Sequence, residues 1–135
     1  MKKGDALSPL KKTPITREQL KLYADASGDH NLIHLDDDAA QKVGLPGVIA
    51  HGMLTMAFMG EFLQQNINEL MPKMGAKHGK IAEFSSRFKA MAFPGDTITI
   101  TGSIREVDMN HVECDIEARN QKGELTTTGY AVLIF

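Results

Sequence analysis

The pattern of apolar positions changes from helical to strand spacing near residue 80. Between Gly52 and Leu70, apolar residues recur every three or four positions, which is the spacing of one face of a helix. This predicted face comprises Met53, Met56, Ala57, Gly60, Leu63, Ile67 and Leu70, and it is widened by Leu54, Phe58 and Phe62. After that, apolar and polar residues alternate as in half-buried strands, over residues 82–90, 98–104, 112–118 and 124–135. Helices followed by consecutive antiparallel strands predict an α+β fold, in which a curved antiparallel sheet wraps around the long central helix.

Capping residues, glycines and prolines predict where the other elements begin and end. Thr16-Arg17-Glu18-Gln19 has the spacing of a capping box that starts a helix. Asp36-Asp37-Asp38 precedes a short helical segment that Gly44 is expected to end, and Pro72 is expected to close the central helix. Residues 1–15 predict a leader or an edge strand.

Composition narrows the class of protein. The 135 residues include 15 Lys and Arg against 17 Asp and Glu, for a formal net charge of −2, so the chain lacks the basic excess of a nucleic-acid binder. Its single cysteine, Cys114, cannot form an internal disulfide and fits a reducing, cytoplasmic setting. The longest uncharged stretch, residues 44–60, is too short and too rich in glycine for a membrane span. We expect a single domain over residues 1–135, with no nucleic-acid or membrane partner.

The last predicted strand differs from the others because it is apolar on both faces. Residues 130–135 read Tyr-Ala-Val-Leu-Ile-Phe. One face of an antiparallel sheet normally meets water, where such a strand would be poorly placed. We therefore hypothesise that this strand is buried in a subunit interface.

Candidate chemistry concentrates in two clusters, residues 27–34 and 49–53. Asp29 and His34 lie five residues apart on an irregular loop and could converge as an acid–base pair. Gly52 begins a buried helix, whose free N–H groups could stabilise negative charge developing on an oxygen. The same residues also fit a structural role, in which Asp29 and Asn31 shape a turn and His34 fills a polar pocket. Spacing alone leaves both interpretations open.

A family resemblance favours the chemical interpretation. The segments that carry it are Tyr23, Ser27-Gly28-Asp29, Asn31, Ile33-His34, Ala40, Pro46, Ile49 and His51-Gly52. In order and spacing they closely resemble the signature of MaoC-like dehydratases, the (R)-specific enoyl-CoA hydratase family. The resemblance covers roughly residues 16–135 and implies a hot-dog fold. Leu32 stands where that family usually has proline, and the loss of a fixed φ there could loosen the loop.

The resemblance implies (R)-specific hydration of trans-2-enoyl thioesters to (3R)-3-hydroxyacyl thioesters, or the reverse dehydration. By position, Asp29 and His34 resemble the catalytic pair, Asn31 the residue that orients them and the water, and the Gly52 N–H the oxyanion-hole donor. Three more residues are expected to bind substrate: Ser27, His51 and Met53. The substrate would be an acyl-CoA or acyl carrier protein thioester, and no metal or cofactor is required. A homodimer is expected, with a heterodimer as the alternative.

Two other functions stay open, a hot-dog acyl thioesterase and a non-catalytic subunit that binds acyl thioesters or supports assembly. A zinc site at His30 and His34 is disfavoured because no third imidazole or thiolate follows at metal spacing. Cys114 occupies an inward strand position and is predicted to be core rather than a nucleophile. The basic loop at residues 73–80 is expected to be solvated surface, or a contact for the phosphates of coenzyme A or the acidic face of an acyl carrier protein, as are Arg87 and Lys89.

Overall fold

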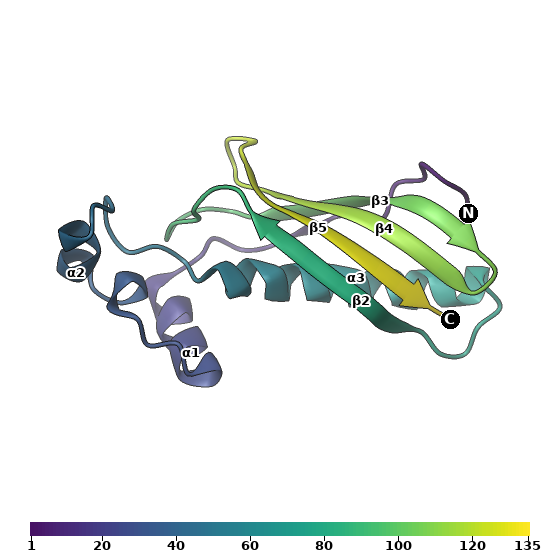
Figure 1. The fold of residues 1–135 in the computed structure, drawn as a ribbon, viewed down its shortest axis with the longest axis horizontal. Coiled ribbons are helices and arrows are strands. Elements are labelled where there is room, and N and C mark those ends of the chain that lie inside the picture. The colour runs from purple at the N-terminus through teal and green to yellow at the C-terminus, as the bar shows by residue number, and fades with distance from the viewer.

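The computed structural model describes all residues, 1–135, and shows an antiparallel sheet of five strands curved around one long helix (Figure 1). The strand order is β1-β3-β4-β5-β2. The helical elements are α1 (Arg17–Ser27), the 3-10 turn η1 (Leu32–His34), α2 (Asp37–Lys42) and α3 (Gly52–Lys73). The strands are β1 (Leu10–Lys11), β2 (Lys80–Phe88), β3 (Thr99–Asp108), β4 (His111–Arg119) and β5 (Leu125–Ile134). This is the predicted α+β arrangement.

The N-terminal segment forms an edge strand. Leu10 pairs with Ile100 of β3, which places β1 at one edge of the sheet. The buried side chain of Asn66 accepts a hydrogen bond from the Ser8 N–H and donates one to the Ser8 carbonyl oxygen. These bonds hold the segment against α3, and within residues 1–15 the edge strand is limited to Leu10–Lys11.

The predicted caps of the shorter helices are present. The Thr16 hydroxyl accepts a hydrogen bond from the Gln19 N–H at 3.0 Å, and Gly28 ends α1 with a φ of 80°. Asp36 caps α2 through the Asp38 N–H. Gly44 follows α2 with a φ of 90°, a conformation that glycine adopts without strain.

Helix α3 is longer than predicted and its buried stripe is rotated. It continues through Pro72 to Lys73, because a proline in the last turn costs few helix hydrogen bonds and the Met74 N–H still bonds the Leu70 carbonyl oxygen. Met53 and Ala57, expected on the apolar face, are exposed. The side chains buried beneath the sheet are Leu54, Thr55, Phe58, Met59, Phe62, Leu63, Asn66, Ile67 and Leu70. No helix combines the length and apolar character needed to cross a membrane.

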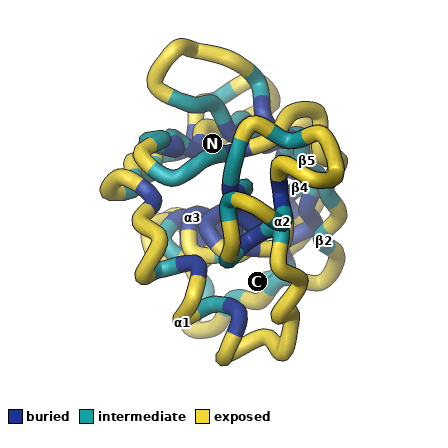
Figure 2. Tube along the Cα trace, turned by 90° about the vertical axis from the view of Figure 1, so that its left-hand side faces the viewer, coloured by how far each residue is buried: buried dark blue, intermediate teal, exposed yellow.

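The core lies between α3 and the concave face of the sheet. Figure 2 shows buried residues gathered on α3 and the strands beside it, whereas α1 is mostly exposed. Cys114 on β4 is fully buried, and burial raises the pKa of its thiol to about 12. It is therefore a core residue, as predicted.

The apolar last strand lies inside the sheet, between β4 and β2. Ala131 and Leu133 are fully buried, and Val132, which alternates with them, is 9% exposed. An interior position already accounts for much of the apolar character of β5 within one chain. Burial of its outer face in a subunit interface stays a prediction.

Candidate active site

A loop between α1 and η1 carries the first part of the site. The Ser27 hydroxyl accepts a hydrogen bond from the Asp29 N–H, and the Asp29 carboxylate accepts one from the Asn31 N–H, both at 3.2 Å. The Asn31 side-chain oxygen then accepts from the Ile33 N–H at 3.2 Å. These bonds lie on both sides of Leu32, so side chains hold the loop at the point where proline is absent.

His34 faces Asp29 with a defined tautomer. Its Nδ1 lies 2.8 Å from the Ile49 carbonyl oxygen, which can only accept, so Nδ1 carries the proton. In neutral His34, the unprotonated Nε2 then lies 3.9 Å from Asp29 Oδ2. That distance is too long for a direct hydrogen bond, and a shared water or substrate atom can connect the two groups.

His51 supports both partners from behind. Its Nε2 donates to the main-chain carbonyl oxygen of Asp29 at 3.1 Å, and its ring stacks on His34 with centroids 3.9 Å apart. The Tyr23 ring packs edge-on against the His51 ring, with centroids 4.8 Å apart. Burial lowers the pKa of His51, the charge of His34 lowers it further, and the bond to Asp29 raises it. The geometry therefore favours a neutral His51 that positions Asp29 and His34.

Gly52, the first residue of α3, brings main-chain donors to the same place. N–H groups in the first turn of a helix have no partner within the helix, and the helix dipole adds positive charge there. A Cβ at this position would lie 3.1 Å from the Phe88 ring. Glycine thus allows a ligand oxygen to approach the main chain between α3 and β2.

His34 lines two hollows. The first has a volume of about 180 Å³ and is lined by His34, Ile49, Ala50, His51, Gly52, Thr55, Phe88, Ala90, Met91, Ala92 and Thr127. The second, of about 600 Å³, is lined by His34 together with Arg17, Glu18, Lys21, Leu35 and Val48. The first, which we call the active-site cavity, is mostly apolar and joins His34 to Gly52. It can accept a small apolar group beside a polar reaction centre.

The structure brings together some of the predicted residues and leaves others outside. His34, His51 and Gly52 line the cavity, and Asp29 lies outside its lining with Oδ2 3.9 Å from His34 Nε2. Ser27 and Asn31 shape the loop and are exposed, and neither they nor Met53 lines the cavity. Met53 is 54% exposed in the first turn of α3.

Sequence reasoning missed several parts of the site. The carbonyl group of Ile49 sets the His34 tautomer, and no side-chain pattern could reveal a main-chain acceptor. Phe88 covers Gly52, and its inward position in the strand pattern was the available signal. Thr55 and Thr127 come from different elements that only the fold places on one cavity.

The site suits proton transfer better than metal binding. Asp29, His34 and His51 bring three possible ligand atoms within 4.8 Å of one another. However, the two imidazole rings are stacked with only 22° between their planes. Lone pairs of imidazole nitrogens lie in the ring plane, so two nearly parallel rings cannot both point at one ion. His30 lies apart and bonds Asp25 at 3.0 Å.

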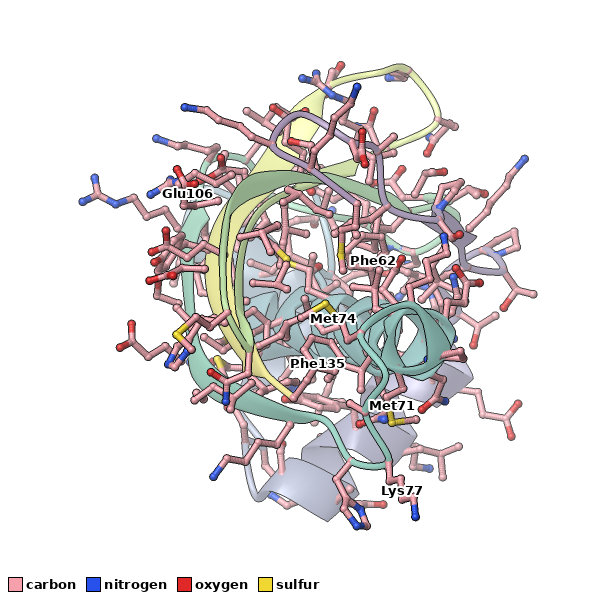
Figure 3. The ribbon with its side chains drawn as sticks, turned by 90° about the vertical axis from the view of Figure 1, so that its right-hand side faces the viewer. Phe62, Met71, Met74, Lys77, Glu106 and Phe135 are labelled. Carbon is pink, nitrogen blue, oxygen red and sulfur yellow. The ribbon has the colours of Figure 1, made fainter.

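The basic loop lies at the other end of the molecule. Helix α3 has 22 residues and separates Gly52 from Lys73 by about 30 Å at 1.5 Å per residue. Lys77, labelled in Figure 3, lies beyond that far end near Met74 and Phe135. Within one chain, residues 73–80 are thus remote from the site, whereas Arg87 and Lys89 adjoin in sequence Phe88, which lines the cavity.

Comparison with known proteins identifies the family. The profile of the family described as "MaoC like domain" matches residues 2–128. The chain belongs to the MaoC-like dehydratase family. The structure of the MaoC-like protein superposes on the (R)-hydratase from A. caviae involved in PHA biosynthesis with a TM-score of 0.84 and 24% identity, over 100% of this chain and 97% of that one. The predicted hot-dog fold is confirmed.

Two curated proteins share more sequence with the MaoC-like protein. Fatty acid synthase 2 of Mycosarcoma maydis is 31% identical over 119 residues, which are 88% of this chain and 3% of that protein. The 3-hydroxyacyl-thioester dehydratase Z of Mycobacterium tuberculosis is 32% identical over 96 residues, 70% of this chain and 60% of that protein. The chain thus spans less than two thirds of either relative. These similarities agree with membership of the MaoC-like dehydratase family.

Proposed function

We propose that the MaoC-like protein catalyses (R)-specific hydration of trans-2-enoyl thioesters to (3R)-3-hydroxyacyl thioesters, or the reverse dehydration. The observation that carries this proposal is that the unprotonated His34 Nε2 and Gly52 share one small cavity, while the Asp29 carboxyl group lies 3.9 Å from that Nε2. Such a set of groups supplies proton transfer on one side of a substrate and stabilisation of an oxyanion on the other.

In the hydration direction, His34 Nε2 accepts a proton from water as its oxygen attacks C3 of the enoyl group. The Asp29 carboxyl group delivers a proton to C2 on the same face, and a proton returns from His34 to Asp29 to restore the pair. The two groups lie 3.9 Å apart, so a shared water can carry the proton from one to the other.

The thioester oxygen carries negative charge between these two steps. The Gly52 N–H and the positive end of α3 stabilise it, and loss of one such donor typically lowers the rate about 100- to 1,000-fold. The Asn31 side-chain oxygen is used by the Ile33 N–H, which leaves its amide NH₂ group available to hold the water. Ser27 acts through Asp29, whose N–H its hydroxyl group bonds.

The thioester would be carried by coenzyme A or an acyl carrier protein. Arg87 and Lys89 are exposed and are the sequence neighbours of Phe88, which lines the cavity. We assign the contact with the carrier's phosphates to these two residues rather than to the basic loop. An R87A/K89A variant should raise KM more than it lowers kcat, since the phosphates lie away from the reacting carbons.

We also propose that two copies associate along β2, the edge strand next to β5. The outer main-chain groups of an edge strand are free to pair with another strand. Phe88, Met91 and Met53 are 51%, 47% and 54% exposed nearby, and a second copy would cover them. Light scattering coupled to size-exclusion chromatography should give twice the chain mass. A monomer that binds a non-identical MaoC-like subunit would instead favour a heterodimer.

The deciding experiment follows the near-ultraviolet enoyl absorbance of crotonyl-CoA mixed with the protein, with chiral analysis of the product. Loss of the band with a (3R)-hydroxy product supports the proposal. Release of free thiol would identify a thioesterase. Binding of the thioester with neither change would favour a non-catalytic subunit.

A further inference from the structure

The inner end of the active-site cavity is closed by successive layers of side chains between α3 and the sheet. The cavity reaches Thr55 of α3, Phe88 of β2 and Thr127 of β5. Phe88 and Thr127 are paired in the sheet, and both threonines are at least 97% buried, with exposures of 3% and 2%. Thr55, Phe88 and Thr127 form the deepest layer among the residues that line the cavity.

The next layer has small residues on the sheet and methionines on the helix. Ser86 and Gly129 are paired and lie two positions from Phe88 and Thr127, so they face the same side. The Ser86 hydroxyl group lies 3.4 Å from the Met56 sulfur. A Cβ atom on Gly129 would overlap the terminal methyl carbon of Met59. The space that larger sheet residues would fill is therefore occupied by two thioether side chains, which we call the methionine plug.

The third layer is closed by an aromatic ring. Phe84 pairs with Ala131, two positions further along the strands. A Cβ atom on Gly60 of α3 would lie 3.8 Å from the Phe84 ring, an ordinary contact distance. Removal of the plug would thus lengthen the cavity by one layer, up to Phe84.

The methionine plug limits the size of the group that can enter. The cavity has a volume of about 180 Å³, slightly more than the roughly 150 Å³ apolar cavity that holds benzene in a model protein. It therefore has room for a fragment of about six carbon atoms. Methionine has an unbranched, flexible side chain, so shortening it changes the space without demanding a new backbone conformation.

We propose that Met56 and Met59 determine acyl chain length, and that the protein acts on short 2-enoyl thioesters of about four to six carbons; this rests on the proposed function. Met59 is the principal residue because it is fully buried, whereas Met56 is half-buried. Two strand positions span about 6.6 Å, the length of roughly five methylene groups at about 1.3 Å each. An eight-carbon chain should fit once the plug is shortened, and a twelve-carbon chain should still meet Phe84.

The test compares kcat/KM for crotonyl-CoA, trans-2-octenoyl-CoA and trans-2-dodecenoyl-CoA. The wild type should prefer the four-carbon substrate at least tenfold over the eight-carbon one. Met59→Ala should raise the ratio of kcat/KM for the eight-carbon substrate to kcat/KM for the four-carbon substrate at least tenfold, and it should not admit the twelve-carbon chain. Met56→Ala should change this ratio in the same direction. Met59→Leu keeps most of the volume and should resemble the wild type, as should Met71→Ala at the far end of α3. An unchanged ratio in both alanine variants overturns the plug.

A binding measurement separates this proposal from the proposed function. Saturated butyryl-CoA and octanoyl-CoA cannot be hydrated, so their Kd values from calorimetry do not depend on turnover. Met59→Ala should bind octanoyl-CoA at least tenfold more tightly than the wild type does. That gain without hydration of any enoyl thioester would support the plug and reject the enzyme activity. Hydration of enoyl thioesters with no gain in octanoyl-CoA affinity and no change in the kcat/KM ratio would support the enzyme activity and reject the plug.

Discussion

The imidazole rings of His34 and His51 lie face to face, 3.9 Å apart, and each donates to a different carbonyl oxygen. His34 Nδ1 bonds Ile49, and His51 Nε2 bonds Asp29. The His34 ring is thereby fixed with a free Nε2 beside the cavity. The His51 ring holds Asp29, which faces that Nε2. Two adjacent positive charges would repel one another, so His51 must stay neutral when His34 accepts a proton.

The first prediction concerns acid stability. The pKa of His51 is lowered in the folded chain. Below pH 6.5, His51 therefore binds a proton more readily in the unfolded chain than in the folded chain. The resulting stability is complete above pH 6.5 and declines as the pH falls through the folded pKa, at up to about 1.4 kcal/mol per pH unit. Thermal unfolding between pH 8 and 5 should show this decline, and His51→Phe should flatten it. Equal slopes in both proteins would contradict a neutral His51.

The second prediction concerns the acid–base pair. Asp29→Asn and His34→Gln should each lower kcat about 100- to 10,000-fold, because each removes a proton-transfer group. Asp25→Asn is the matched control, since Asp25 bonds the exposed His30 outside the cavity. Rates of crotonyl-CoA hydration measure the effect. Unchanged hydration in Asp29→Asn would show that the acid–base assignment is wrong.

The third prediction concerns Gly52. In Gly52→Ala, the new Cβ atom would lie 3.1 Å from the Phe88 ring and narrow the approach to the helix N–H groups. We expect kcat to fall at least about tenfold, within the range for weakened oxyanion donors, with little change in thermal stability. Gly60→Ala on the same helix meets Phe84 only at 3.8 Å and is the control. Equal kcat values in the two variants would remove the main-chain donor from the mechanism.

The fourth prediction concerns Gly102 on β3. A Cβ atom there would lie 2.8 Å from the Asp115 carbonyl oxygen and 3.0 Å from the Phe62 ring. Neither neighbour can move freely, because one is main chain and the other is fully buried. Gly102→Ala should lower the free energy of unfolding by about 1–3 kcal/mol. Urea unfolding checks this, and a loss below that of Gly60→Ala would count against the close packing.

The fifth prediction concerns Cys114. Burial raises the pKa of its thiol to about 12, so almost no thiolate exists near neutral pH. A disulfide reagent at pH 8 should leave the folded protein unmodified and should react fully once the chain is unfolded. Rapid reaction in the folded protein would show that β4 opens locally.

Local patterns predicted most of the elements because helix caps and strand alternation depend on residues close in sequence. Thr16 and Gln19 are three positions apart, so their capping bond required no knowledge of the fold. The prediction that Pro72 closes the central helix was wrong for the same reason. It used the tendency of proline to end helices without the position of Pro72 in the last turn of α3. Met53 was expected on the apolar face of the central helix because helical spacing does not specify where the apolar stripe ends, whereas it is 54% exposed.

The sequence by itself determined the α+β order of elements, the loop that carries Asp29 and His34, and the glycine that starts α3. Only the tertiary structure decided which groups complete the site. The Ile49 carbonyl oxygen is 15 positions from His34, and Met59 meets Gly129 from another element. Contacts of this kind arise when α3 packs into the curved sheet, and no local spacing records them because the residues become neighbours only on folding.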